Sequence, residues 1–293
     1  MIIYEDSCAV VIENVKDFNI HHIFSSGQSV RWKKQKDNSY ICVVKDKIIN
    51  VSQIDDILYF KNTNLDDVKN FWVNYFGLDV NYSIIKKEIL NISPNLSHII
   101  DFGSGLRILN QDEWETLITL ILSANNSMQI LEKVVDNLCS RYGDYIGEYE
   151  GEKYYSFPTP NKLSSLSLDE LRECKVGFRD KYIKSTSTVI YNNDIDLYNL
   201  NKLDTKSCLD NLRELSGVGE KVADCVAMLS MKKYDVFAVD VWIKRIMEDI
   251  YFSNKSNSVK KIRSFAVDKF GDLSSFVQQY LFFFARQNKV GKS

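Results

Sequence analysis

Hydrophobic and polar positions follow one pattern before residue 103 and a different one after it. In the first part, short apolar or alternating runs end at polar breaks, which predicts strands. These runs cover 10–12, 30–35, 40–45, 48–52 and 57–61. Residues 36–38 separate two runs like the turn of a hairpin, and the β-branched and aromatic content suits an antiparallel sheet. Apolar residues at helical spacing predict a helix over 65–76.

After the glycines at 103 and 105 the chain is a succession of amphipathic segments with very little strand signal. One apolar face runs over 114–122, and Ser127 can cap a following helix whose apolar face runs over 130–138. Further helices are predicted at 181–190, 206–215, 220–231, 241–251, 258–270 and 274–286. The predicted fold class is therefore α+β, with an antiparallel-sheet domain with helices over 1–103 and an all-helical domain over 104–293.

Composition narrows the class of protein but does not suggest a substrate. The chain of 293 residues is 45% hydrophobic and 26% charged, with a net charge of −2, which argues mildly against binding DNA by bulk electrostatics. Its 6 cysteines are scattered and its 3 histidines lie apart from them, so we expect reduced thiols, and neither zinc nor an iron–sulfur cluster. Without an apolar span or a secretory signal, we expect a cytoplasmic, prokaryotic protein with no membrane partner.

The most informative segment covers residues 212–225, where one helix ends, Gly217 and Gly219 make a tight turn, and a second helix begins. The first amides of a helix point outward and suit a phosphate, although many such hairpins bind nothing. Lys221 lies in the first turn of the second helix. A desolvated lysine can become a nucleophile that forms a Schiff base, whereas most helix lysines are simply solvated. Asp240 precedes another helix and can be its N-cap or an electrostatic stabiliser of positive charge.

The residues around Lys221 resemble the helix-hairpin-helix of base-excision DNA glycosylases, and the string from Lys221 to Cys225 resembles the 8-oxoguanine branch. The Gly-Pro-Asp element of the superfamily is altered here to Ala238, Val239 and Asp240. The resemblance implies a glycosylase and AP lyase in which Lys221 attacks the anomeric carbon of an extruded nucleotide and Asp240 assists. We therefore expect a monomer that acts in DNA repair on double-stranded DNA that contains 8-oxoguanine.

Resemblance at other places implies how the damaged base is recognised. Residues 26–32 resemble the family segment in which a glycine carbonyl, here that of Gly27, accepts a hydrogen bond from N7–H of the oxidised base. Undamaged guanine has only an acceptor at N7, so one carbonyl can distinguish the two bases. Gln278 and Phe282 correspond to a glutamine on the pairing edge and a stacking phenylalanine, and Cys225 would face the other side of the base. Each of these residues, seen alone, is also compatible with a turn or a packed core.

The resemblance also assigns residues to the opposite strand. Asn125 would fill the gap left by the extruded base, Phe178 would form the wedge, and Arg179 would read the orphaned cytosine. Animal members carry a second cytosine-reading arginine where this chain has Ile130. The sequence therefore predicts a relaxed preference for the opposite base, because a bidentate contact contributes about 1–3 kcal/mol of discrimination.

The resemblance implies an enzyme that requires no cofactor. It also implies a structural monovalent cation at the hairpin. Its ligands would be the backbone carbonyls of Arg213, Leu215 and Val218. Two further departures concern DNA contacts, with Trp242 at the place of a phosphate-binding histidine and Ala285 at that of an aspartate. Two alternatives stay open: a glycosylase of the same superfamily for another damaged base, and a non-catalytic helix-hairpin-helix protein that only binds DNA.

Overall fold

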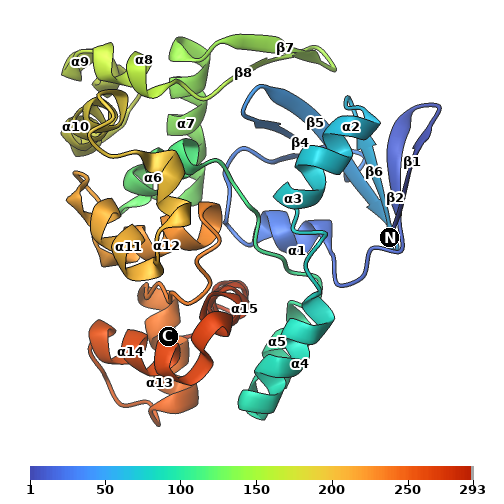
Figure 1. Ribbon diagram of the computed structural model, residues 1–293, viewed down its shortest axis with the longest axis vertical. Coiled ribbons are helices and arrows are strands. Elements are labelled where there is room, and N and C mark those ends of the chain that lie inside the picture. Colours follow the sequence, from blue (N-terminus) through green and yellow to red (C-terminus); the bar gives the residue numbers. More distant parts are fainter. Residues whose placement is uncertain (292–293) are drawn as a thin grey trace.

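The computed structural model describes residues 1–291 and consists of a sheet-containing part and a helical part. Figure 1 shows the sheet on one side of the molecule and the helices of the second half on the other, with α4 and α5 below the sheet. The α+β class predicted from the sequence is confirmed, with an antiparallel sheet first and a mostly helical region after it.

The large sheet has six strands in the order β1-β2-β6-β5-β4-β3, and all neighbours are antiparallel. Its strands are β1 (Ile2–Asp6), β2 (Ala9–Glu13), β3 (Lys33–Lys34), β4 (Tyr40–Val44), β5 (Lys47–Ile54) and β6 (Ile57–Lys61). The helices of this half are α1 (Ile20–Ser25), α2 (Leu65–Asp67), α3 (Val73–Tyr75), α4 (Tyr82–Ile92) and α5 (Ser97–Phe102). One face of the sheet packs on an apolar core that includes Trp32, Phe60 and Phe76.

Two predictions for this half need correction. The run over 30–35 is strand only at Lys33–Lys34, because Val30 and Trp32 turn inward to two different cores. The helix predicted over 65–76 is interrupted by a π-helical segment, Val68–Trp72, between α2 and α3. The edge strand β1 was not predicted from the apolar pattern, because most of its side chains are exposed.

The second half is built from ten α-helices with short 3₁₀ turns among residues 104–291. They are α6 (Glu113–Ser123), α7 (Met128–Tyr142), α8 (Pro160–Ser165), α9 (Leu168–Glu173), α10 (Asp180–Tyr191), α11 (Thr205–Glu214), α12 (Glu220–Ser230), α13 (Val241–Tyr251), α14 (Val259–Phe270) and α15 (Ser274–Gln287). The 3₁₀ turns of the chain are Pro94–Leu96, Gly177–Arg179, Leu197–Lys202 and Gly271–Leu273. As predicted, the Ser127 side chain accepts from the Ile130 amide and caps α7.

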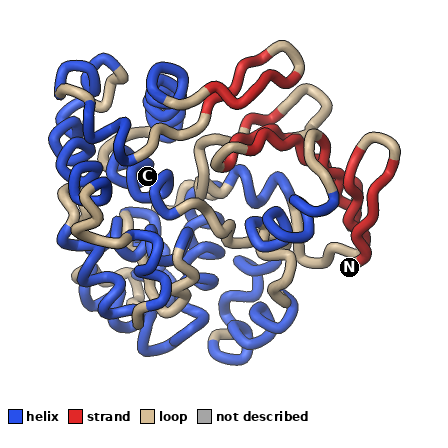
Figure 2. Tube along the Cα trace, turned by 45° about the horizontal axis from the view of Figure 1, so that its top comes forward, coloured by secondary structure: helices blue, strands red, loops and turns tan. Residues whose placement is uncertain are grey.

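The helical half also contains a β-hairpin that the sequence did not reveal, so it is mostly rather than entirely helical. Strands β7 (Tyr145–Tyr149) and β8 (Glu152–Tyr155) extend from the helices toward the large sheet (Figures 1 and 2). Ile146, Tyr149 and Tyr154 pack there on a small cluster of buried residues from β4 and β5. The hairpin therefore joins the two halves.

The predicted division at residue 103 coincides with a close approach between segments. Gly103 ends α5, and the Gly105 carbonyl accepts from the amide of Asn19, the N-cap of α1. A Cβ at Gly105 would lie 2.4 Å from the Asn19 Cβ, so only glycine fits. Packing does not follow the division strictly, because α4 and α5 contribute side chains to the helical core. Among residues 1–291 no helix is long and apolar enough to cross a membrane.

Candidate active site

The helical hairpin that carries Lys221 is formed by α11 and α12. Gly217 has φ +83°, and a Cβ on it would lie 3.0 Å from the Tyr182 side chain, so the turn requires glycine. Gly219 is the N-cap of α12, makes no side-chain cap hydrogen bond, and has open space where a Cβ would point. The first amides of α12 are therefore approachable by an anion from outside the protein.

Lys221 and Asp240 line one cavity of about 640 Å³. Asp240 is the N-cap of α13, and its Oδ1 accepts from the amides of Trp242 at 2.9 Å and Ile243 at 2.8 Å. These two hydrogen bonds fix the carboxylate at the cavity edge, so the N-cap role considered from the sequence is confirmed, and the stabilising role stays a prediction. Lys221 is exposed, and the protein alone does not supply the apolar surroundings expected for a nucleophilic lysine. Bound DNA would have to exclude the water.

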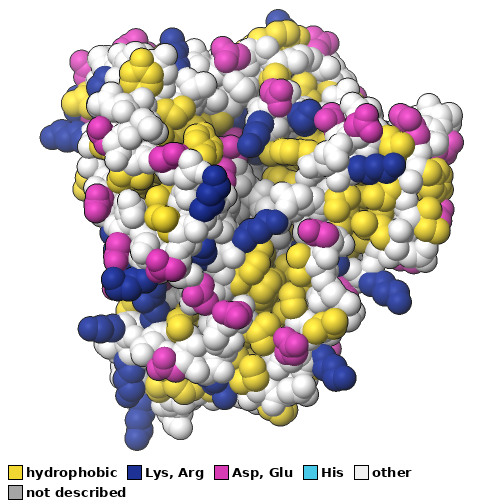
Figure 3. Space-filling model, in the orientation of Figure 1, with side chains coloured by type: hydrophobic (Ala, Val, Ile, Leu, Met, Phe, Trp, Pro, Cys, Tyr) yellow, Lys and Arg dark blue, Asp and Glu magenta, His cyan; other side chains and the backbone are white. Residues whose placement is uncertain are grey.

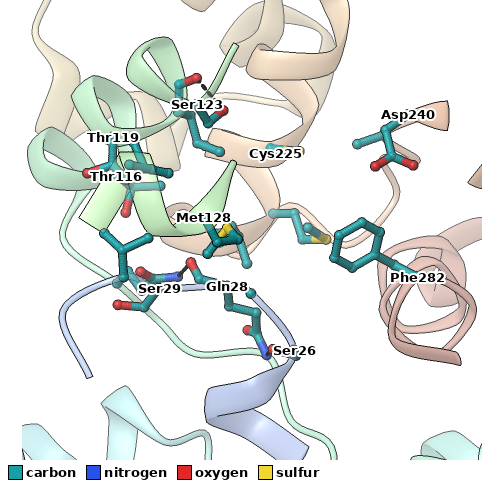
Figure 4. Close-up of a pocket in the computed structure, with 18 of the residues that line it drawn as sticks. Ser26, Gln28, Ser29, Thr116, Thr119, Ser123, Met128, Cys225, Asp240 and Phe282 are labelled. Atoms are coloured by element: carbon teal, nitrogen blue, oxygen red, sulfur yellow. Dashed lines mark hydrogen bonds between the residues drawn. The ribbon is translucent and has the colours of Figure 1, made fainter. Parts of the chain in front are cut away.

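The residues expected to recognise the base line the same cavity, although they come from distant parts of the chain. Gly27 follows α1, Cys225 lies one turn after Lys221 on α12, and Gln278 and Phe282 lie one turn apart on α15. Burial raises the pKa of the Cys225 thiol to about 12, and the nearby Lys221 ammonium only partly opposes this. Cys225 is therefore a neutral thiol at physiological pH. Figure 4 shows Asp240 and Phe282 on one side of the cavity, across from Ser29 and Gln28.

The lining of the cavity also includes polar residues that sequence reasoning missed. The Oγ1 atoms of Thr116 and Thr119 on α6 and the Oε1 atom of Gln279 on α15 are buried without a hydrogen-bond partner among residues 1–291. Beside them, burial raises the pKa of Glu115 to about 7, although Arg31 at 3.8 Å opposes the shift. Helical spacing could have indicated the two threonines, because they lie three residues apart on one face of α6.

Residues expected to act on the opposite strand are not among those that line this cavity, and they lie in the loop after α6 and in the 3₁₀ turn Gly177–Arg179. Asn125 is exposed with φ 56°, between α6 and α7, and Phe178 is 61% exposed. Arg179 is buried. Its guanidinium donates to the carbonyls of Ala124 and Val176 and lies 4.4 Å from the centre of the Phe178 ring. Arg179 therefore joins the Asn125 loop to Phe178.

The surface around the site has no single basic field on the face seen in Figure 3. Lys and Arg side chains alternate there with Asp and Glu, which agrees with the net charge of −2. Among residues 1–291, no group of three His, Cys, Asp or Glu side chains is arranged to hold a metal ion. The hairpin carbonyls proposed for a cation belong to the backbone, and the Leu215 carbonyl accepts from the Val218 amide at 3.1 Å.

Two family models match adjoining parts of the chain. Residues 10–117 match the N-terminal domain of 8-oxoguanine DNA glycosylase, and residues 118–270 match the HhH-GPD superfamily of base excision DNA repair proteins.

Curated relatives and a solved structure resemble most of the chain. The N-glycosylase/DNA lyase of Saccharomyces cerevisiae is 30% identical over 86% of this chain and 73% of its own length. A probable N-glycosylase/DNA lyase of Methanothermobacter thermautotrophicus is 33% identical over 66% of this chain and 68% of its own length. The Clostridium acetobutylicum 8-oxoguanine glycosylase/lyase, solved with double-stranded DNA that contains cytosine opposite 8-oxoguanine, is 40% identical over 99% of both chains, with a TM-score of 0.95.

Proposed function

Since the chain belongs to the HhH-GPD superfamily of base-excision repair proteins, and within it to the 8-oxoguanine DNA glycosylases, we propose that it excises 8-oxoguanine from duplex DNA and then cleaves the strand. The observation that carries the proposal is one cavity that brings Lys221 and Asp240 together with Gly27, Gln278 and Phe282. A protein that only binds DNA does not need a nucleophile and a carboxylate in one cavity.

Lys221 and Asp240 carry out different parts of the proposed reaction. The Lys221 amine forms a bond to the anomeric carbon while the glycosidic bond breaks, and the base leaves with the electron pair and takes up a proton. The fixed carboxylate of Asp240 stabilises the positive charge that develops on the sugar. Opening of the sugar ring leaves an imine on Lys221. Loss of a proton from C2′ then expels the 3′ phosphate, which nicks the strand.

Recognition of the base is assigned to the remaining residues of the cavity. The Gly27 carbonyl would accept from N7–H, which undamaged guanine lacks. Phe282 and Cys225 would lie against the two faces of the base. The amide of Gln278, whose Oε1 now accepts from the Ala238 amide at 3.4 Å, would meet its pairing edge.

We further propose a relaxed reading of the opposite base. Ile130 has no hydrogen-bonding side chain and is 50% exposed, so Arg179 alone would read the cytosine. In the same region, Asn125 would fill the gap left by the base and Phe178 would form the wedge. At the hairpin, the carbonyls of Arg213, Leu215 and Val218 lie at or just after the negative end of α11 and would suit a monovalent cation. The amides after Gly219 would bind a phosphate.

Reductive trapping tests the proposed chemistry. Borohydride added during a reaction with an 8-oxoguanine duplex should link the protein covalently to DNA, and Lys221→Gln should give no adduct. Lys153→Gln, an exposed lysine of β8, is the matched control and should behave as wild type. Asp240→Asn keeps the N-cap but removes the charge, so excision should slow by about 10²–10³ while the fold is retained.

Two outcomes would refute the proposal in favour of an alternative. An adduct formed only with thymine glycol or an alkylated base would indicate a different glycosylase of the superfamily. Binding of every duplex without any adduct would indicate a non-catalytic DNA-binding protein.

A further inference from the structure

Arg286 lies in the cavity with Lys221 and Asp240, although no motif of the sequence pointed to it. It follows Phe282 by one turn on α15, so both side chains leave the helix on the same face. The guanidinium is half-buried, and its Nη1 donates to the carbonyl of Ser26 at 3.2 Å. This hydrogen bond joins the last helix to a segment 260 residues earlier in the chain.

The acceptor of this hydrogen bond is a carbonyl at the end of α1. Ser26 is the C-cap of that helix, and the last carbonyls of a helix have no partner within it. They also form its negative end, which attracts a guanidinium. The neighbouring Gln287 donates to the Ser25 carbonyl at 3.5 Å but is exposed, so it touches the same helix end from outside the cavity.

Gly27 follows the acceptor directly and is packed against the same arginine. Its φ is +85°, and a Cβ built on it would lie 2.1 Å from Arg286 Nη1. The guanidinium therefore occupies the space into which any other residue at position 27 would project its side chain. The backbone conformation favours glycine here, and a side chain at position 27 would displace the Arg286 guanidinium from the peptide that it now contacts.

The other side of Gly27 is fixed by Gln28. The Gln28 amide donates to the Ser26 hydroxyl at 3.0 Å and to the Arg107 carbonyl at 2.7 Å, and its Oε1 accepts from the Leu109 amide at 2.9 Å. Ser26 and Gln28 lie together at the lower edge of the cavity in Figure 4. Gly27 is thus held between Gln28 and Arg286.

Charge also ties Arg286 to the reacting end of the cavity. Burial lowers the pKa of the Arg286 guanidinium, and the negative charge of Asp240 opposes that shift. The arginine therefore lies in the electric field of the carboxylate at the reacting end of the same cavity.

We infer that Arg286 is a positioning residue for damage recognition, which holds the Gly27 carbonyl in the place where N7–H of the oxidised base is read. The inference rests on the proposed function, because it assumes that Gly27 distinguishes 8-oxoguanine from guanine. A hydrogen bond weakens steeply as distance and angle depart from their optimum, so a carbonyl that discriminates by one hydrogen bond must be held firmly.

The test measures separately how well the protein distinguishes 8-oxoguanine from guanine and how fast it cleaves DNA. In the Lys221→Gln background, the ratio of Kd for undamaged and 8-oxoguanine duplexes should fall about tenfold in Arg286→Met, because a charge-assisted hydrogen bond is lost. With Lys221 intact, Arg286→Met should slow excision of 8-oxoguanine more than cleavage at a preformed abasic site, where no base is read. Arg286→Lys should restore most of the ratio, and Gln287→Ala, the matched control on the exposed side, should match wild type.

Results that would overturn the role of Arg286 differ from those that would refute the proposed function. A ratio unchanged in Arg286→Met, or a parallel loss of excision and abasic-site cleavage, would overturn the positioning role. If Arg286→Met does not fold, Arg286→Gln is compared in the same assays and judged by the same two criteria. A wild-type protein without preference for 8-oxoguanine would instead refute the proposed function, and this outcome is visible before any variant is made.

Discussion

At the scale of single residues, Ile130 makes the clearest difference between this chain and the two-arginine arrangement of animal relatives. It lies in the first turn of α7, is 50% exposed, and follows the Asn125 loop. A side chain that projects from this position into solvent can be exchanged without disturbing a core. Ile130→Arg should therefore add a contact to the orphaned cytosine and increase the preference for cytosine over adenine by about tenfold or more.

Excision rates on 8-oxoguanine paired with each of the four bases measure this preference. Ile130→Lys is the matched control, because it adds the same charge without the planar fork that reads a base. It should raise affinity for all four duplexes alike. A wild-type preference already as strict as that of the Ile130→Arg variant would contradict the relaxed reading.

Residues in continuous motifs could be assigned from the sequence, whereas those defined by the fold could not. Lys221, Asp240 and Gly27 each lie in a short string that resembles a family motif, and the structure brings all three to one cavity. Arg286 has no such string, and its role depends on the close approach of α15 to α1. The inward orientation of Arg179 depends on the Ala124 carbonyl, which no local pattern indicates.

At the scale of elements, helix α12 is held in place by a buried ion pair that the sequence did not predict. Arg263 on α14 donates to both carboxylate oxygens of Asp224 on α12, at 2.7 Å each, and the Asp224 side chain is only 1% exposed. Burial raises the pKa of Asp224, and the hydrogen bonds from Arg263 oppose that rise. Because Asp224 lies one turn from Lys221, the ion pair fixes the helix that presents the nucleophile.

Removing one partner of this pair should be costly. Arg263→Met leaves a buried carboxylate unpaired and should lower the free energy of unfolding by about 3–5 kcal/mol. The double variant with Asp224→Asn should recover part of that loss, because no uncompensated charge remains. Denaturant unfolding measures both, with Lys260→Met, an exposed position of α14, as the control. Additive effects of the two substitutions would show that they do not act as a pair.

Element prediction succeeded where one apolar face repeats over a long segment and failed where packing partners are distant. Helices α12, α13 and α15 follow their predicted ranges within a few residues, because each buries a regular face. The strand predicted over 30–35 includes only two residues in the structure, because its inward side chains pack on separate cores. The spacing over 65–76 indicated a helix but not its π-helical interruption.

At the scale of the whole molecule, the cavity is completed by both halves of the chain, so their relative placement matters for function. Gly27 comes from the sheet-containing half, and Lys221, Asp240 and Phe282 come from the helical half. Arg31, close to Gly27 in sequence, donates to the Cys139 thiol and to the Tyr155 carbonyl, at 2.7 Å each. Tyr155 is the last residue of β8, so the hairpin is anchored beside the base-reading segment.

The β7–β8 hairpin should therefore stabilise the arrangement of the two halves. Ile146 packs on the cluster formed by Ile41, Val43 and Ile48 of the sheet. Ile146→Asp places a charge on this apolar surface and should lower the Tm by about 3–8 °C. Because the hairpin end also holds Arg31, the same variant should slow excision of 8-oxoguanine more than cleavage at a preformed abasic site. Glu148→Thr, an exposed position of β7, should change neither, and an Ile146→Asp protein with wild-type Tm and excision rate would show that the hairpin does not join the halves.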